Sequence, residues 1–193
     1  MITRDTASPQ DKEVVHVTIG DFYATSKPVV LQTVLGSCVS ACLFDPVHKV
    51  AGMNHILLPG KADIFAYDEN SCYGISAMER LINEITRRGG VRTCLKAKIF
   101  GGGHVLATAS LSSSTGMKNV DFVLNYLQVE KIPLISQNTG GSFTRRIFFH
   151  TDSFDVFVKR IPAKIKFEVT PEEEELAKRI QEQIKKPDDI EFF

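Results

Sequence analysis

Two reactive side chains stand in short, motif-like surroundings in the first third of the chain: Cys38 follows Gly36-Ser37, and His55 follows Met53-Asn54. A thiol with a pKa of ~8.5 is only slightly ionised at neutral pH, whereas a neighbouring imidazolium lowers that pKa and creates a nucleophilic thiolate. The thiolate attacks a carbonyl carbon, and the imidazolium donates its proton to the leaving nitrogen. Small residues before the cysteine let a substrate come close and let a tight turn offer amide N–H groups to an oxyanion.

A predicted hairpin brings Cys38 and His55 together. If Pro46-Val47 forms the centre of a tight turn, Asp45 faces His48, and the same register carried outward makes Cys38 face His55. Directly opposed residues have Cβ atoms ~4.5–5.5 Å apart, close enough for a sulfur and an imidazole nitrogen to interact. The alternative is that Cys38 is a small buried hydrophobic residue and His55 a structural one. Spacing alone leaves both interpretations open.

Other arrangements of the same residue types are weaker. Cys38 and Cys42, with His48 and His55, could be read as zinc ligands, but four residues of strand separate the two sulfurs by ~13 Å, too far for one tetrahedral ion. We therefore expect no metal and no cofactor. The glycines at 101–103 lack the surrounding residues of a nucleotide-binding loop, so we expect a flexible turn there, with a loop near the substrate entrance as the alternative.

The elements that must position these residues are mostly strands. Apolar and β-branched runs predict strands near 13–19, 29–35, 39–44, 49–58, 94–100, 132–136, 145–151 and 154–161. Helical spacing of apolar residues predicts helices over 73–88 and 119–130, and Thr170-Pro171 followed by acidic residues predicts a C-terminal helix. Because several strands follow one another without an intervening helix, we expect an α+β fold of layered mixed sheets. Its β-sandwich-like core would be flanked by the two main helices plus the C-terminal helix.

Composition limits the class of protein. The 193 residues include 23 Lys plus Arg and 23 Asp plus Glu, so the net charge is zero and no basic surplus indicates nucleic-acid binding. No apolar run reaches the ~18–20 residues of a membrane span, and the polar N-terminus lacks the features of a secretory signal. We therefore expect no membrane insertion, a cytoplasmic location and four cysteines that remain thiols. We expect a flexible segment over 1–12, one domain over 13–161 and a C-terminal helical extension and tail over 162–193.

The order of short motifs along the chain resembles that of the CheD family, the chemoreceptor glutamine deamidases of bacterial and archaeal chemotaxis. The resemblance covers roughly 14–161 and lies in Leu35-Gly36-Ser37-Cys38-Val39, Asp45-Pro46, Gly52–Pro59, Tyr73-Gly74 with Ala77-Met78, Lys96–Gly102, Asn119 with Phe122-Val123, Gly140-Gly141, Arg145-Arg146 and Val158-Lys159.

The resemblance implies a papain-like cysteine hydrolase on a layered α+β scaffold, which converts glutamine side chains of methyl-accepting chemotaxis receptors to glutamate and releases ammonia. Cys38 would be the nucleophile and His55 the general base and acid. It also implies the phosphatase CheC as a partner. One alternative is a non-catalytic chemotaxis adaptor that binds CheC or the receptor through the same groove. Another is a cysteine hydrolase with a different amide substrate, because a Cys–His pair does not name its substrate.

The third catalytic residue departs from the family pattern. The family often has a threonine six residues before the nucleophile, where it orients the histidine; here that position is Gln32, and Thr33 is next to it. A one-residue bulge could bring Thr33 into place, the Gln32 amide oxygen could take the role, or another residue could supply it. We assign the role to Thr33.

Overall fold

A computed structural model describes residues 3–5, 12–58, 69–104 and 115–161. Its strands are β1 (Thr3–Asp5), β2 (Val14–His16), β3 (Phe22–Thr25), β4 (Val30–Leu35), β5 (Val39–Asp45), β6 (Val50–Asn54), β7 (Lys96–Gly101), β8 (Leu134–Thr139), β9 (Thr144–His150) and β10 (Val156–Ile161). Its helices are α1 (Glu69–Arg87), α2 (Thr115–Val129) and the short 3₁₀ helix η1 (Arg92–Cys94).

The strands form two five-stranded mixed sheets. One has the order β1-β2-β4-β9-β10 and the other the order β3-β6-β5-β7-β8. Only β2 with β4 and β7 with β8 pair in parallel among the described strands; the other neighbours are antiparallel. The expected α+β fold of layered mixed sheets is confirmed. Neither α1 nor α2, the α-helices of the described segments, has the length and hydrophobicity to cross a membrane.

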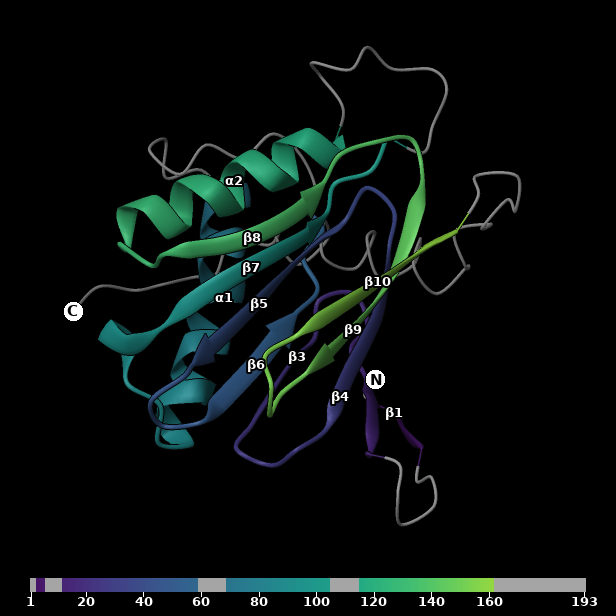
Figure 1. Ribbon diagram of the computed structural model, residues 1–193. Helices are drawn as coiled ribbons and strands as arrows, with labels where there is room; N and C mark the ends of the chain where they lie inside the picture. Colours follow the sequence, from purple (N-terminus) through teal and green to yellow (C-terminus); the bar gives the residue numbers. More distant parts are fainter. Residues whose placement is uncertain (1–2, 6–11, 59–68, 105–114, 162–193) are drawn as a thin grey trace, which may run out of the picture.

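Strand β5 lies at the centre of three layers. Figure 1 shows α1 and α2 on one side of the β3-β6-β5-β7-β8 sheet and β4, β9 and β10 on its other side. Alternate residues of β5 therefore enter different apolar clusters: Val39, Ala41 and Leu43 pack with the helices, whereas Cys42 and Phe44 pack with the opposite sheet. Because both faces are covered, all seven residues of β5 are buried.

The register of the β5–β6 hairpin differs from the prediction by two residues. Cys42 pairs with Met53, and an isolated bridge pairs Val39 with Ile56, so Cys38 and His55 are not directly opposed. The cause is a four-residue connection over 46–49 in place of a two-residue turn, which Lys49 closes with a φ of 56°. Because side chains alternate along a strand with a period of two, this shift leaves Cys38 and His55 on the same face.

Three further expectations need correction or stay open. Within the segment 1–12, Thr3–Asp5 forms strand β1, which pairs with β2, and the flexible segment over 1–12 stays a prediction. The short strands β1 and β3 were not predicted, since three or four residues give little periodic signal. The predicted C-terminal helix and tail lie outside the described residues, and the domain limits 13–161 and 162–193 remain predictions.

Candidate active site

Thr33 and His55 meet across the space between the two sheets. Strand β4 pairs regularly with β9 from Val30 to Leu35, so its side chains alternate without a bulge. Thr33 faces inward, and its Oγ1 lies 2.8 Å from Nδ1 of His55. Gln32 faces the other way, where its amide nitrogen is 3.5 Å from Nδ1 of His16. Of the two residues considered from sequence, only Thr33 contacts His55 in this way.

His55 is held from both sides of its backbone and is only 4% exposed. Its N–H donates to the carbonyl of Asp21, and its carbonyl accepts from the N–H of Gly20. Burial lowers the pKa of His55 to about 4, although the backbone of Val17 and the charge of Asp21 act in the opposite direction. The imidazole is therefore neutral at pH 7, and its Nε2 is buried without a hydrogen-bond partner in the described segments.

Cys38 stands directly before β5, on the face that carries His55. Val39 and Ile56 exchange both backbone hydrogen bonds, so Cys38 and His55 each precede one member of that bridge. Such diagonal neighbours are ~7–8 Å apart at Cα and within reach of longer side chains. Cys38 is 7% exposed, whereas Cys42, further along the strand, is fully buried, and burial raises the pKa of its thiol. Cys38 is thus the better placed nucleophile of the two.

The glycines at 101–103 form a packed clamp on the Cys38 loop, which corrects the expectation of a flexible turn. The N–H of Gly102 donates to the Cys38 carbonyl and that of Gly103 to the Gly36 carbonyl, both at 2.7 Å. A Cβ on Gly101, whose φ is 113°, would lie 2.1 Å from the Cys38 carbonyl oxygen. Glycine is required here because the two chain segments touch through their backbones.

Asn119 is a positioning residue whose role the sequence did not indicate. Its side chain is completely buried near the start of α2. Its Nδ2 donates to the Ser37 carbonyl at 2.9 Å, and its Oδ1 accepts from the N–H of Leu58 at 3.0 Å. One amide thus joins the segment before Cys38 to the segment after His55. A polar residue within the apolar face of a predicted helix was the available signal.

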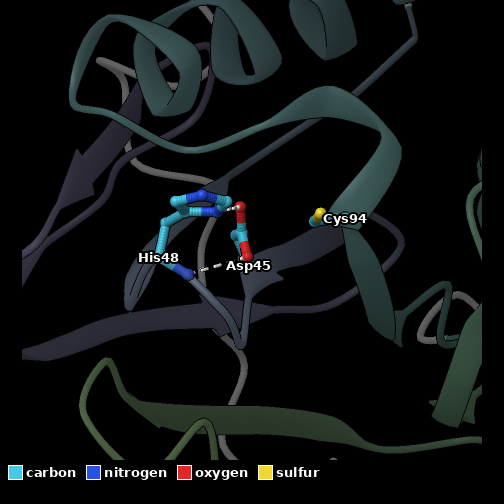
Figure 2. A group of neighbouring side chains, drawn as sticks. All are labelled: Asp45, His48 and Cys94. Atoms are coloured by element: carbon cyan, nitrogen blue, oxygen red, sulfur yellow. Dashed lines mark hydrogen bonds and ion pairs between the residues drawn. The ribbon is translucent and has the colours of Figure 1, made fainter.

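A second polar group lies at the opposite end of the β5–β6 pair, where Asp45, His48 and Cys94 offer possible metal-ligand atoms within 4.8 Å of one another (Figure 2). Both carboxylate oxygens of Asp45 are already used. Oδ1 accepts from the N–H groups of Val47 and His48, and Oδ2 accepts from His48 Nδ1 and from the N–H of Val91. This pattern is typical of a carboxylate that holds a turn together.

Fold and site together define a layered α+β protein whose candidate site combines a thiol with an imidazole held by a hydroxyl group. The family model described as CheD chemotactic sensory transduction matches residues 57–160. This match begins after Thr33, Cys38 and His55 and therefore does not depend on them. The chain belongs to the CheD family.

Relatives match over most of the chain. A protein of Shewanella oneidensis named "Probable chemoreceptor glutamine deamidase CheD 1" is 37% identical over 186 residues, which cover 95% of this chain and 89% of the relative. A Vibrio cholerae protein named "Probable chemoreceptor glutamine deamidase CheD" is 40% identical over 187 residues, covering 93% and 78%. The solved structure of the Bacillus licheniformis hypothetical protein YfiH aligns with a TM-score of 0.39 and 15% identity over 61% of this chain and 50% of that one, too low a similarity to support an argument.

Proposed function

We propose that this protein is a glutamine deamidase of chemoreceptors and that Cys38, His55 and Thr33 carry the reaction without metal or cofactor. The observation that supports this most is the contact of Thr33 with His55 Nδ1, because it leaves Nε2 as the imidazole nitrogen without a hydrogen-bond partner in the described segments. Membership of the CheD family supplies the substrate, because its relatives are named chemoreceptor glutamine deamidases.

His55 begins the reaction as a neutral base. An imidazole that donates its Nδ1 hydrogen to Thr33 Oγ1 keeps a lone pair on Nε2, which takes the thiol proton of Cys38 as the sulfur attacks. The new bond joins sulfur to the side-chain carbon of the target glutamine, and the carbonyl π electrons move to its oxygen. The resting pair is therefore a neutral thiol and a neutral imidazole and not a thiolate with an imidazolium, because burial of His55 disfavours its charged form.

The tetrahedral intermediate then loses ammonia. The carbonyl re-forms, the carbon–nitrogen bond breaks, and His55 returns its proton to the departing nitrogen. In the second half, His55 removes a proton from water, which attacks the thioester carbon. The carbon–sulfur bond breaks, Cys38 regains its proton, and the product side chain is a glutamate.

Mass spectrometry of a receptor cytoplasmic fragment tests this proposal. We expect the wild-type protein to convert particular glutamines to glutamates with stoichiometric release of ammonia, and Cys38→Ala to convert none. Cys42→Ala is the matched control, because it removes a thiol from the same strand face without touching the site. Equal maps for wild type and Cys38→Ala would reject the enzyme.

An adaptor role with the phosphatase CheC as partner, and a cytoplasmic location, stay predictions.

The enzyme role and the adaptor role can be separated by experiment, because an adaptor needs the surface around Cys38 but not its sulfur. Binding of purified CheC to wild type and to Cys38→Ala, measured by calorimetry, should be equal if both roles exist. A protein that binds CheC but modifies no receptor glutamine would be an adaptor only. Release of ammonia from other amides, without receptor modification, would indicate a cysteine hydrolase with a different substrate.

A further inference from the structure

Tyr73 places a phenol beside the loop that holds His55. It lies in α1, partly buried against the helix-side core. Its hydroxyl oxygen is 3.6 Å from the position that a Cβ on Gly20 would occupy. Gly20 and Asp21 are the residues that hydrogen-bond the carbonyl and the N–H of His55. The Tyr73 hydroxyl therefore lies against the backbone support of the catalytic imidazole.

The next residue along the helix connects Tyr73 to the Cys38 side of the site. A Cβ on Gly74 would lie 2.4 Å from the ring of Phe122 and 3.0 Å from Cδ2 of Leu58, so α1 approaches both closely. Leu58 is bonded to Asn119, which is bonded in turn to the Ser37 carbonyl. Because a side chain at position 74 would collide with both residues, packing holds this turn of α1, with Tyr73, against Leu58 and next to the Asn119 bridge.

The charges around Tyr73 keep its hydroxyl a donor. Burial is the largest cause that raises the pKa of Tyr73; Arg80 opposes it, and Cys38, when ionised, and Asp21 raise the pKa further. The phenol is therefore protonated at neutral pH.

We propose that the Tyr73 hydroxyl donates a hydrogen bond to the side-chain oxygen of the target glutamine while that oxygen becomes an oxyanion. The proposal rests on the deamidase function. The Cys38 sulfur bonds to the side-chain carbon, the carbonyl π electrons move to the oxygen, and the Tyr73 proton stays on Tyr73 throughout. A donor fixed before the reaction stabilises the developing charge without reorganisation.

Several other donors near Cys38 already have partners. The side-chain amide of Asn119 donates to Ser37, and the N–H groups of Gly102, Gly103 and Val39 donate to backbone carbonyls. Thr33 is engaged with Nδ1 of His55. The Tyr73 side chain comes from a different layer than the catalytic residues, and the charge of Cys38 is among the causes that raise its pKa.

The test is the deamidation kinetics of Tyr73→Phe on the receptor fragment, with Tyr126→Phe as the matched control. Tyr126 is also a phenol on a helix of the same layer, but it is buried in the helix-side core and its hydroxyl donates to Glu79. We expect kcat to fall roughly 10²-fold in Tyr73→Phe, as on removal of one oxyanion donor, with KM within ~2-fold of wild type. The pH dependence of iodoacetamide labelling at Cys38 should be unchanged.

Each other result rejects the proposal. An unchanged kcat, or a change confined to KM, removes Tyr73 from the transition state. A fall in kcat that accompanies a raised apparent pKa of Cys38 in labelling assigns Tyr73 to stabilising the thiolate. Wild-type protein that leaves the receptor unmodified rejects the deamidase function, and this proposal with it.

A second variant covers the case in which Tyr73→Phe fails to fold. Meta-fluorotyrosine introduced at position 73 alone keeps the ring and the hydroxyl and makes the O–H a stronger donor. We expect its kcat to equal or exceed that of wild type, and an unchanged thermal midpoint. A kcat reduced 10-fold or more in this variant, with the fold intact, contradicts a hydrogen-bond donor role.

Discussion

Two histidines stand at opposite ends of the β5–β6 pair, and each is hydrogen-bonded through Nδ1. The side chain of His48 is 40% exposed, and its partner is the carboxylate of Asp45. His55 is buried, and its partner is the hydroxyl of Thr33. His48 has the stronger hydrogen-bond partner, a carboxylate, but it belongs to a turn. His55 has a neutral hydroxyl as its partner and lies on the same strand face as Cys38.

The His48 and His55 groups differ in whether their polar atoms have hydrogen-bond partners in the protein. In the His48 group every carboxylate oxygen accepts two hydrogen bonds, so its polar atoms are satisfied by the protein. In the His55 group Nε2 is buried and has no hydrogen-bond partner within the described segments. Burying a polar atom without a partner costs ~1–3 kcal/mol. In the proposed mechanism this atom later receives the proton of the Cys38 thiol.

Deleting each histidine in turn should change the deamidation rate to very different extents. We expect His55→Ala to lower the deamidation rate by more than ~10³-fold, since it removes the proposed base and acid. His48→Ala should retain most of the wild-type rate. Ammonia release with the receptor fragment measures both. If His48→Ala were the inactive variant and His55→Ala active, the assignment of the two ends would be reversed.

The second effect is the acid sensitivity that burial of His55 introduces. Its pKa is about 4 when folded and ~6.5 when unfolded, so the unfolded chain binds a proton between these values and the folded chain does not. The contribution of His55 to stability should therefore be full above pH 6.5, decline as the pH falls to 4 and change no further below. The pKa difference corresponds to ~3 kcal/mol.

Urea unfolding at pH 7 and pH 4.5 measures this loss. Comparison with His55→Gln isolates it from the titration of carboxylates, because the two proteins differ in this one group. We expect the free energy of unfolding of wild type to fall more steeply with acid than that of His55→Gln. Parallel curves would mean that His55 is as easily protonated in the folded chain as in the unfolded one.

The third effect concerns Thr33. Replacing it with the isosteric valine leaves Nδ1 of His55 without its hydroxyl partner. We expect kcat to fall about 10-fold to 100-fold, since a hydrogen bond of ~1–3 kcal/mol is lost and each 1.4 kcal/mol is a factor of ten. Gln32→Ala is the matched control from the opposite face of β4 and should be near wild type. A larger loss in Gln32→Ala would transfer the orienting role to Gln32.

Part of this site was predictable because an error of two residues in the predicted register leaves each side chain on the same face of its strand. The alternation of the predicted hairpin was enough to place Cys38 and His55 on one face, whereas Thr33 and Gln32 became candidates through the resemblance to the CheD family. The register was wrong by two residues because the connection over 46–49 is longer than a two-residue turn, yet the same faces remained in contact. The Asn119 bridge and the clamp at 101–103 were not predictable, because they depend on how α2 and the end of β7 approach the Cys38 loop in space.

At the His48 end of the β5–β6 pair, we expect a change at Asp45 to alter stability but not activity. Burial alone would raise the pKa of Asp45, but hydrogen bonds from Val91, His48 and Val47 outweigh it and hold that pKa below its usual value. Its contribution to stability is therefore present above the unfolded pKa of ~3.8 and lost as the pH falls below it, a more acidic range than that of His55.

Asp45→Asn keeps the shape of the side chain but turns one acceptor into a donor that faces other donors. We expect it to lower the free energy of unfolding by ~2 kcal/mol at pH 7, as for loss of hydrogen bonds to a charged group, with kcat on the receptor fragment unchanged. Urea unfolding and the deamidation assay measure the two quantities separately. A large loss of kcat with intact stability would place Asp45 in the reaction, and the two ends of the hairpin would no longer differ in role.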